Sequence, residues 1–231
     1  MRFLAVAMLA CATVAFAVPA AAQVSVLTTG AYHDAAARAV QASGVACTIT
    51  SDTAGGGLRR IRKGERFDVV VNTPAGIDAL IAEGALAPPR RDVARIGIGV
   101  AVRAGSPRPA VSDEGALRDL LLAAPGIAMI DPAAGGSSGV ALFRLFERWG
   151  VMETLRPKLL LITAGRAAER VAAGEATVAL QQMTELDVPG VDVVGPLPDS
   201  VQVYTVYAAA VRLRSTSEAT AVLRAMEAAA P

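Results

Sequence analysis

Short apolar runs alternate with alanine-rich segments of helical periodicity along most of the chain. Residues 24–27 form one such run, and a polar turn at residues 28–30 leads into the first helical segment. The same order of strand, polar loop and helix recurs at residues 46–65 and 67–86. Because strands that alternate with helices usually pair in parallel and are covered by those helices, the pattern predicts an α/β fold.

Two further copies of this unit lie in the second half of the chain. Residues 126–139, GIAMIDPAAGGSSG, pass from an apolar run into a loop of small residues. Large apolar side chains then recur at helical spacing until Gly150. Residues 159–175 repeat the plan before another strand-like run at residues 176–182. Repetition of one strand–loop–helix unit predicts sheets that are mainly parallel and flanked by helices.

The loops of these units share a small, polar composition that bears on function. In parallel sheets, ligands bind beyond the carboxyl ends of the strands, where such loops meet. Each helix that begins there presents unpartnered N–H groups and a partial positive charge, which suits an anion. Helix capping explains any one loop, but the glycines at 55–57 and GGSSG at 135–139 exceed what capping requires. Neither run is followed by GK[ST], so a nucleotide-binding P-loop is not indicated.

Two β-prone stretches with proline and glycine predict crossings between lobes. They occupy residues 95–109 and 191–212. A chain that leaves one domain and later returns to it forms two lobes with a cleft between them. We therefore expect a first lobe at residues 23–102, a second lobe at residues 103–203 and a return to the first lobe at residues 204–231.

The first 22 residues have the pattern of a secretory signal peptide. Arg2 precedes an apolar run, and Pro19 and the small residues at 20–22 form a cleavage site. The apolar run is shorter than the roughly 20 residues that a membrane span needs. We predict cleavage after Ala22 and export to the periplasm.

Net charge and histidine content argue against two classes of function. The whole chain has 22 basic and 21 acidic residues, and loss of Arg2 with the leader balances them. A chain without clustered excess positive charge is not expected to bind nucleic acid. His33 is the single histidine, so a multi-histidine metal site is not expected, and we predict neither a metal nor another cofactor.

Several segments share their order and spacing with a known family. They are the leader, DVVVNTPAGIDALIAEGAL at residues 68–86, RIGIGVAVRAGSP at residues 95–107 and IDPAAGGSSGVALFRLFERWGV at residues 130–151. Together they resemble periplasmic substrate-binding proteins of type II, with the molybdate-binding branch nearest. The resemblance implies a two-lobe periplasmic-binding-protein fold with a ligand cleft between the lobes and closure by hinge motion.

In that branch, hydroxyl and backbone N–H groups of both lobes hold a tetrahedral oxyanion. Three positions here depart from the family's pattern: Ala31 and Ala54 stand where serines are usual, and Gln182 stands where a tyrosine is frequent. The ligand-binding positions that the resemblance implies are Ala31, Thr53, Ala54, Asn72, Thr73, Ser137, Ser138 and Gln182. Thr28 and Thr29 are added because their hydroxyls lie close to the position of Ala31 in the sequence.

Arginines at helix starts open a second possibility for the ligand. Arg59 and Arg60 follow the first glycine run, and Arg166 follows the strand-like run at residues 159–162. A guanidinium can hold a carboxylate by two parallel hydrogen bonds, so an arginine in the cleft favours an organic acid. We add Arg166 to the predicted ligand site, with Arg60 as a further candidate. For each arginine, a solvated or paired surface position is the simpler interpretation.

The sequence thus predicts an exported, monomeric solute-binding protein that captures a small anion, an oxyanion or a carboxylate, for an ABC transporter permease. The alternative is a periplasmic isomerase of a small di- or tricarboxylic acid such as aconitate, because a few exported proteins that resemble this branch have that activity. His33 lies about one helical turn past the first ligand loop and is the candidate base. A purely structural histidine on an alanine-rich helix is the competing interpretation.

Overall fold

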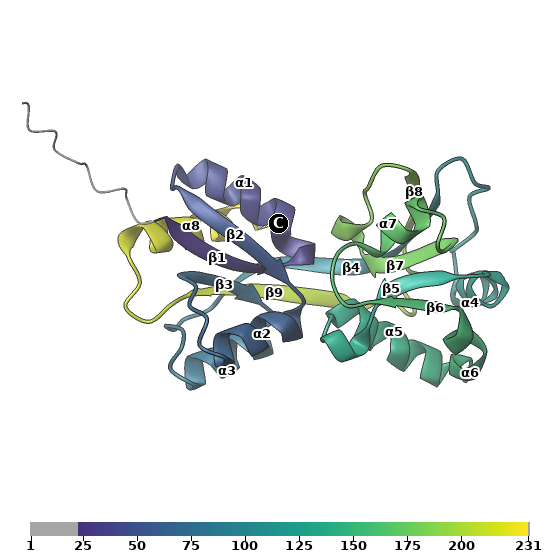
Figure 1. Ribbon diagram of the computed structural model, residues 1–231, viewed down its shortest axis with the longest axis horizontal. Coiled ribbons are helices and arrows are strands. Elements are labelled where there is room, and N and C mark those ends of the chain that lie inside the picture. Colours follow the sequence, from purple (N-terminus) through teal and green to yellow (C-terminus); the bar gives the residue numbers. More distant parts are fainter. Residues whose placement is uncertain (1–22, 231) are drawn as a thin grey trace, which may run out of the picture.

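The described chain consists of two lobes joined by a pair of long strands (Figure 1). The computed structural model describes residues 23–230, and the predicted signal peptide at residues 1–22 lies outside them. The strands are β1 (Val24–Thr29), β2 (Cys47–Asp52), β3 (Val69–Asn72), β4 (Arg91–Arg103), β5 (Ile127–Ile130), β6 (Leu159–Ile162), β7 (Val178–Gln182), β8 (Val191–Pro196) and β9 (Tyr204–Val211).

Helices connect most of these strands. The α-helices are α1 (His33–Ser43), α2 (Ala54–Arg62), α3 (Pro74–Ala82), α4 (Glu114–Ala123), α5 (Ser137–Arg148), α6 (Met152–Leu155), α7 (Ala167–Ala172) and α8 (Ser217–Ala228). Short 3-10 turns are η1 (Gly30–Tyr32), η2 (Pro132–Ala134), η3 (Arg156–Lys158) and η4 (Met183–Glu185). Among residues 23–230, no helix has the length and apolar character needed to cross a membrane.

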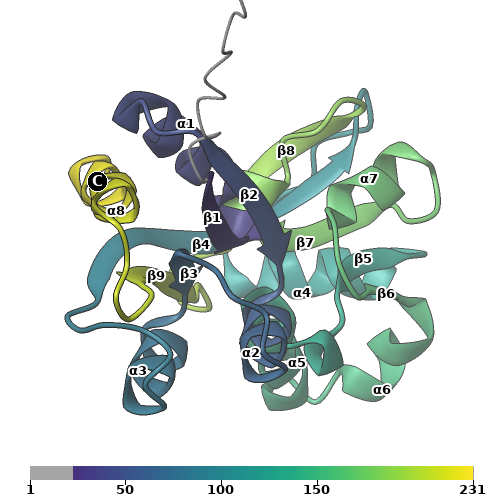
Figure 2. The same cartoon turned by 60° about the vertical axis from the view of Figure 1, so that its left-hand side comes forward.

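The first lobe has the strand order β2-β1-β3-β9. β1 pairs in parallel with β2 and β3, while β9 returns from the other lobe and pairs antiparallel with β3. Figure 2 shows α1 and α8 on one side of these strands and α2 and α3 on the other. The last helix, α8, packs on the first lobe, against α1 and β9.

Strand periodicity explains this two-sided arrangement. Successive side chains of a strand point to opposite faces, and in β3 the side chains of Val69 and Val71 join the apolar core under α1 and α8. Val70, between them, joins the second core under α2 and α3. All three are fully buried, because helices cover both faces of the sheet, as parallel sheets require.

The second lobe repeats this construction. β5 pairs in parallel with β6 and β7, and β4 pairs antiparallel with β7 and β8. Met129 of β5 belongs to the core that includes residues of α4, α5 and α6, whereas its neighbour Ala128 belongs to the core beside α7. The prediction of an α/β fold with two mainly parallel, helix-flanked sheets is confirmed.

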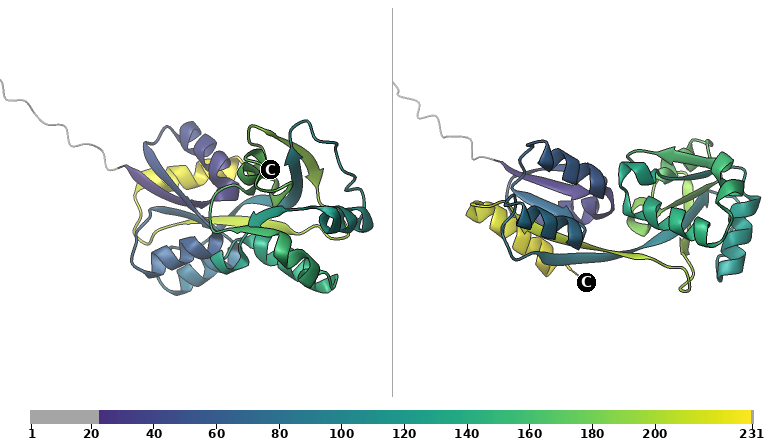
Figure 3. Two further views of the ribbon diagram at one scale, coloured as in Figure 1. Left: turned by 45° about the vertical axis from the view of Figure 1, so that its right-hand side comes forward. Right: turned by 90° about the horizontal axis from the view of Figure 1, so that it is seen from below.

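Strands β4 and β9 cross between the lobes, and they lie side by side along the lower edge of the right-hand view of Figure 3. β4 pairs with β9 as far as Gly97 and with β7 from Ile98 onward. The partner of β4 thus changes between two adjacent residues. The predicted lobe limits stay a prediction, and this change of partner favours a first crossing near Gly97.

Candidate functional site

The loops at the carboxyl ends of the strands meet in a cleft of about 330 Å³ between the lobes. The first lobe brings five of the residues singled out from the sequence to this cleft: Thr29, Ala31, His33, Thr53 and Ala54. The second lobe brings four: Ser137, Ser138, Arg166 and Gln182. Residues more than 100 positions apart in the sequence, such as Thr29 and Ser137, therefore line the same cleft.

Three other predicted ligand residues do not line the cleft. The buried Thr28 hydroxyl donates to the carbonyl of Thr29 at 3.3 Å. The Asn72 amide donates to the carbonyl of Ala54 at 2.9 Å and so supports the start of α2. Thr73 caps α3, because its hydroxyl accepts a hydrogen bond from the N–H of Gly76.

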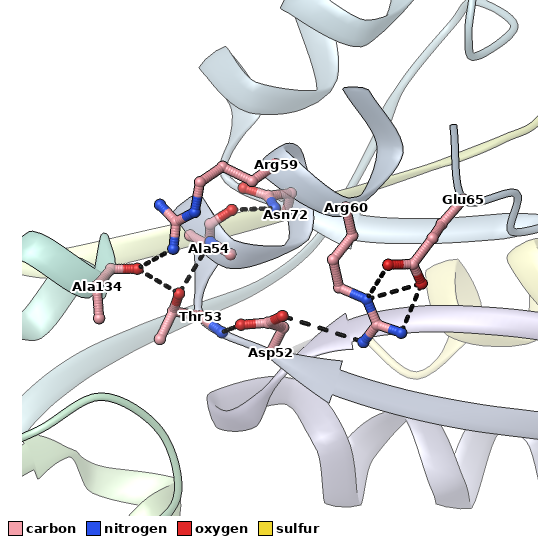
Figure 4. Close-up of polar contacts among 9 residues, drawn as sticks. Asp52, Thr53, Ala54, Arg59, Arg60, Glu65, Asn72 and Ala134 are labelled. Carbon is pink, nitrogen blue, oxygen red and sulfur yellow. Dashed lines mark hydrogen bonds and ion pairs between the residues drawn. The ribbon is translucent and has the colours of Figure 1, made fainter. Parts of the chain in front are cut away.

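One edge of the cleft is a direct contact between the lobes (Figure 4). The Thr53 hydroxyl caps α2 by accepting from the N–H of Gly56, and it donates to the carbonyl of Ala134 at 2.6 Å. The N–H of Gly55 donates to the carbonyl of Gly135 at 3.0 Å. We call Thr53, Gly55, Ala134 and Gly135 the glycine wall.

The two glycines of the wall touch backbone to backbone. A β-carbon at Gly55 would lie 2.9 Å from the Cα of Gly135, and one at Gly135 would lie 2.7 Å from the Cα of Gly55. Gly135 also has φ of +80°, which favours glycine. The lobe–lobe contact thus accounts for one glycine in each of the two unusual runs.

Arg59 and Arg60, which follow the first glycine run, bond to protein groups and do not line the cleft. Arg59 donates to the carbonyl of Ala134 at 3.0 Å and reinforces the wall. Arg60 forms an ion pair with Glu65 at 2.7 Å and lies 4.0 Å from Asp52. In Figure 4, Arg60 points toward these carboxylates, away from Ala134, and it does not line the cleft.

The amino end of α5, which directly follows Gly135 of the glycine wall, supplies hydrogen-bond donors to the cleft. Gly136 is the N-cap, and the first N–H bonded to its carbonyl is that of Val140. The N–H groups of the first turn therefore have no partner within the helix and favour an anion. Ser138 is 3 % exposed, lines the cleft, and its hydroxyl makes no hydrogen bond within residues 23–230.

Ser137 belongs to a side-chain network that joins the lobes. Turned so that its nitrogen donates to the carbonyls of Ile96 and Gly97, the Gln182 amide accepts from Ser137 at 3.1 Å and from Thr205 at 2.8 Å. The Tyr207 hydroxyl, 3.4 Å from the Ser137 oxygen, then donates to it. Burial raises the pKa of Tyr207 to about 12, so this phenol remains a donor.

Glu185 is a buried carboxyl group in the lining of the cleft. It is the last residue of η4 and is 9 % exposed. Its carboxyl group lies against the backbone of Gly30, where a β-carbon would overlap a carboxylate oxygen. Burial raises the pKa of Glu185 to about 8, and the nearby Arg166 guanidinium partly opposes this increase. We call Thr29, Ser138 and Glu185 the polar side of the cleft, since none makes a lobe–lobe hydrogen bond or an ion pair within residues 23–230.

Arg166 is the cationic side chain of the cleft lining. It is the N-cap residue of α7, and its guanidinium pairs with Asp34 of α1 at 3.1 Å across the lobes. His33 lines the same space, and its Nδ1 lies 2.7 Å from the Ser51 hydroxyl. Within the part of the chain that the structure describes, no cluster of three metal-ligating side chains occurs.

Sequence reasoning missed Tyr207 and Glu185. Glu185 follows β7 just as the other polar loop residues follow their strands, so the same rule, extended three residues past Gln182, would have found it. Tyr207 carries a hydroxyl within a strand that is otherwise small and apolar over its last residues. Its phenol lies 3.4 Å from the Ser137 hydroxyl, the same group that bonds to Gln182.

Comparison with known proteins identifies the family. Residues 15–228 match the family described as bacterial extracellular solute-binding protein. The chain belongs to this family. This solute-binding protein is also 37% identical over 159 residues to an aconitate isomerase from a Pseudomonas species. That match covers 68% of this chain and 59% of the isomerase. The chain therefore spans less than two thirds of the isomerase's length.

Solved structures agree on the fold. A periplasmic molybdate-binding protein from Azotobacter vinelandii is similar with a TM-score of 0.67 and 18% identity, over 88% of this solute-binding protein and 97% of that chain. A sulfate-binding protein from Mycobacterium tuberculosis has a TM-score of 0.70 and 17% identity, over 89% and 81% of the two chains. The predicted type II, two-lobe architecture is confirmed.

Proposed function

We propose that this solute-binding protein captures a small organic anion in the cleft between its lobes. The observation that carries the proposal is the convergence of the amino end of α5, the free Ser138 hydroxyl and the Arg166 guanidinium on one cleft. Unpartnered N–H groups and a hydroxyl hold negative charge by preorganised dipoles, and Arg166 adds a permanent positive charge.

Size and composition favour a carboxylic acid over a bare tetrahedral oxyanion. A cleft of about 330 Å³ falls at the lower end of the roughly 300–1,000 Å³ of small-molecule sites. The family's implied oxyanion site contains neutral groups, whereas the cleft lining here includes the charged guanidinium of Arg166. Ala31 also supplies no hydroxyl where that branch usually has one.

We propose that ligand capture serves transport by an ABC transporter. The protein acts in the periplasm as a monomer, closes on its ligand by hinge motion at the two crossings, and delivers it to the permease of an ABC transporter. The family's extracellular setting and its general association with such transporters support this role.

A thermal-shift screen of residues 23–231 tests capture. The panel is citrate, cis- and trans-aconitate, malate, tartrate, molybdate, tungstate, sulfate and phosphate, against sodium chloride at matched ionic strength. A ligand at a hundred times its dissociation constant adds about 2.7 kcal/mol of stability, and we expect such a shift with carboxylates. A shift with molybdate and tungstate alone would contradict the organic-acid assignment, and no shift with any anion would overturn capture.

A second function, isomerisation of a small di- or tricarboxylic acid, is favoured by the 37% identity to an aconitate isomerase. The same cleft contains a buried carboxyl group, Glu185, that anion capture does not require. Conversion of cis- to trans-aconitate, followed by proton NMR, tests this function directly.

A further inference from the structure

One charged group of the cleft is unfavourable for holding an anion. Glu185 lines the same cleft as Ser137 and Gln182, and it is 9 % exposed. A carboxylate repels an anionic ligand, and removing it from water costs free energy. Anion capture by itself therefore gives no reason for an acidic side chain here.

The backbone around Glu185 is fixed on both sides. The hydroxyl of Thr184 donates to the carbonyl of Ala31 at 2.7 Å, which ties η4 to the first lobe. The side chain of Gln181, in β7, accepts from the N–H of Ala167 at 2.6 Å and donates to the carbonyl of Gly165 at 3.0 Å. The segment that carries Glu185 is thus anchored to both lobes, and its carboxyl group packs against the backbone of Gly30.

The nearest cation does not neutralise this carboxyl. Within residues 23–230, Glu185 forms no ion pair, and Arg166 pairs with Asp34 instead. The carboxyl group fits in this place because residue 30 is glycine. A β-carbon there would overlap a Glu185 carboxylate oxygen, which is a steric clash. A fixed, buried and unpaired carboxyl beside an anion site has the geometry of a general acid–base.

We propose that Glu185 is the catalytic acid–base residue of this cleft and moves a proton between two carbon atoms of a bound unsaturated carboxylic acid. The inference rests on the second proposed function, isomerisation, and names the residue that performs it. The substrate class is an acid with a CH₂ group next to a carbon–carbon double bond.

The step is an allylic proton shift with no net change in atoms or electrons. The Glu185 carboxylate takes a proton from the CH₂ group, and the electron pair of that C–H bond becomes the new double bond. The former double-bond pair then takes a proton from the Glu185 carboxyl group at the far carbon, and exchange of that carboxyl proton with solvent between the two transfers labels the product in D₂O. The transient negative charge spreads into the substrate's carboxylates, which the amino end of α5 and Arg166 would hold.

The ionisation of Glu185 suits this role. With a pKa raised to about 8 by burial, both its forms are present near neutral pH. The charged group that lowers this pKa is Arg166, and Asp34 raises it. Tyr207, Glu169 and His33 share the cleft lining. Because the carboxylate is the form that accepts the proton, kcat/KM should rise with pH and level off above about 8.

The test compares wild type, Glu185→Gln and a matched control, Glu153→Gln, whose side chain is 88% exposed on α6. Isomerisation of cis-aconitate in D₂O, and exchange of its CH₂ protons with solvent, are followed by NMR. Binding of cis-aconitate is measured by calorimetry. We expect Glu185→Gln to bind within threefold of wild type and to lose isomerisation and exchange at least about 100-fold, the lower range for general acid–base catalysis. Glu153→Gln should match wild type.

Each other result overturns a stated claim. A Glu185→Gln variant that still isomerises cis-aconitate would overturn the assignment of proton transfer to Glu185. If His33→Gln then lost the activity, the proton transfer would belong to His33 instead. Wild type that binds aconitate without isomerising it or exchanging its protons would overturn this inference and leave anion capture intact. Wild type that binds no anion of the panel would overturn the proposed capture as well as the inference.

Discussion

The glycine wall and the polar side of the cleft are both built from small and polar residues, but they use their hydrogen-bonding groups differently. In the wall, Thr53 and Gly55 donate to carbonyls of the other lobe at 2.6 and 3.0 Å. On the polar side, Thr29, Ser138 and Glu185 make no such bond. The Thr29 hydroxyl is buried without any hydrogen-bond partner among the described residues.

This difference separates contacts that hold the lobes together from groups that remain for a ligand. A buried polar group without a partner costs free energy, and proteins keep such groups mainly where they act on something else. The wall therefore sets how the lobes meet, and the polar side sets what they bind. Three predictions test this division.

The largest expected effect is on stability and comes from Glu185. Its pKa is raised from the ordinary 4.5 to about 8 in the folded protein, so the folded state keeps a proton that the unfolded chain releases near 4.5. The free energy of unfolding should therefore fall as pH rises through this window, at up to about 1.4 kcal/mol per pH unit, and then become level above about 8. The total is on the order of a few kcal/mol.

Urea unfolding of wild type and Glu185→Gln at several pH values between about 5 and 9 measures this effect. The variant lacks the titrating carboxyl, so the stability of wild type should decline relative to the variant with rising pH. Parallel curves for the two proteins would show that Glu185 ionises normally.

A second, intermediate effect is expected on binding. Ser138→Ala should weaken binding of the carboxylate found in the screen at least about tenfold, since a hydrogen bond to a charged group contributes roughly 1.5–3 kcal/mol. The melting temperature of the empty protein should hardly change, because this hydroxyl has no partner within residues 23–230. Calorimetry and thermal melting measure the two quantities, and an unchanged dissociation constant would remove Ser138 from the site.

The smallest effect is expected from Thr53, where a substitution should lower stability and leave ligand affinity nearly unchanged, the reverse of Ser138→Ala. Thr53→Val removes the cap of α2 and the bond to Ala134, so stability should fall by about 1 kcal/mol. Ligand affinity should change less than threefold, because the Thr53 hydroxyl already has a donor and an acceptor. Thr53→Ser, which keeps the hydroxyl, is the control and should restore stability. A large loss of affinity in Thr53→Val with unchanged stability would place Thr53 on the ligand instead.

Much of the fold and part of the site could be predicted from the chain itself. The continuous apolar run of β3 and the repeated strand–loop–helix unit indicate helices on both faces of a parallel sheet. The rule that polar residues after strands gather at one edge placed Ser137, Ser138 and Arg166 correctly in one cleft. The same rule also selected Asn72 and Thr73, whose side chains cap and support helices of the first lobe.

The sequence by itself determined the α/β class, the order of its units and the polar character of the loops, because hydrophobic periodicity and turn residues act over short stretches of chain. Only the tertiary structure decided which loop groups are already bonded and which are free. Gly55 meets Gly135, Tyr207 reaches Ser137, and Glu185 is buried against Gly30, each across 70 or more residues. Such contacts, and the pKa that burial imposes on a carboxyl group, depend on how distant segments pack, which no local pattern encodes.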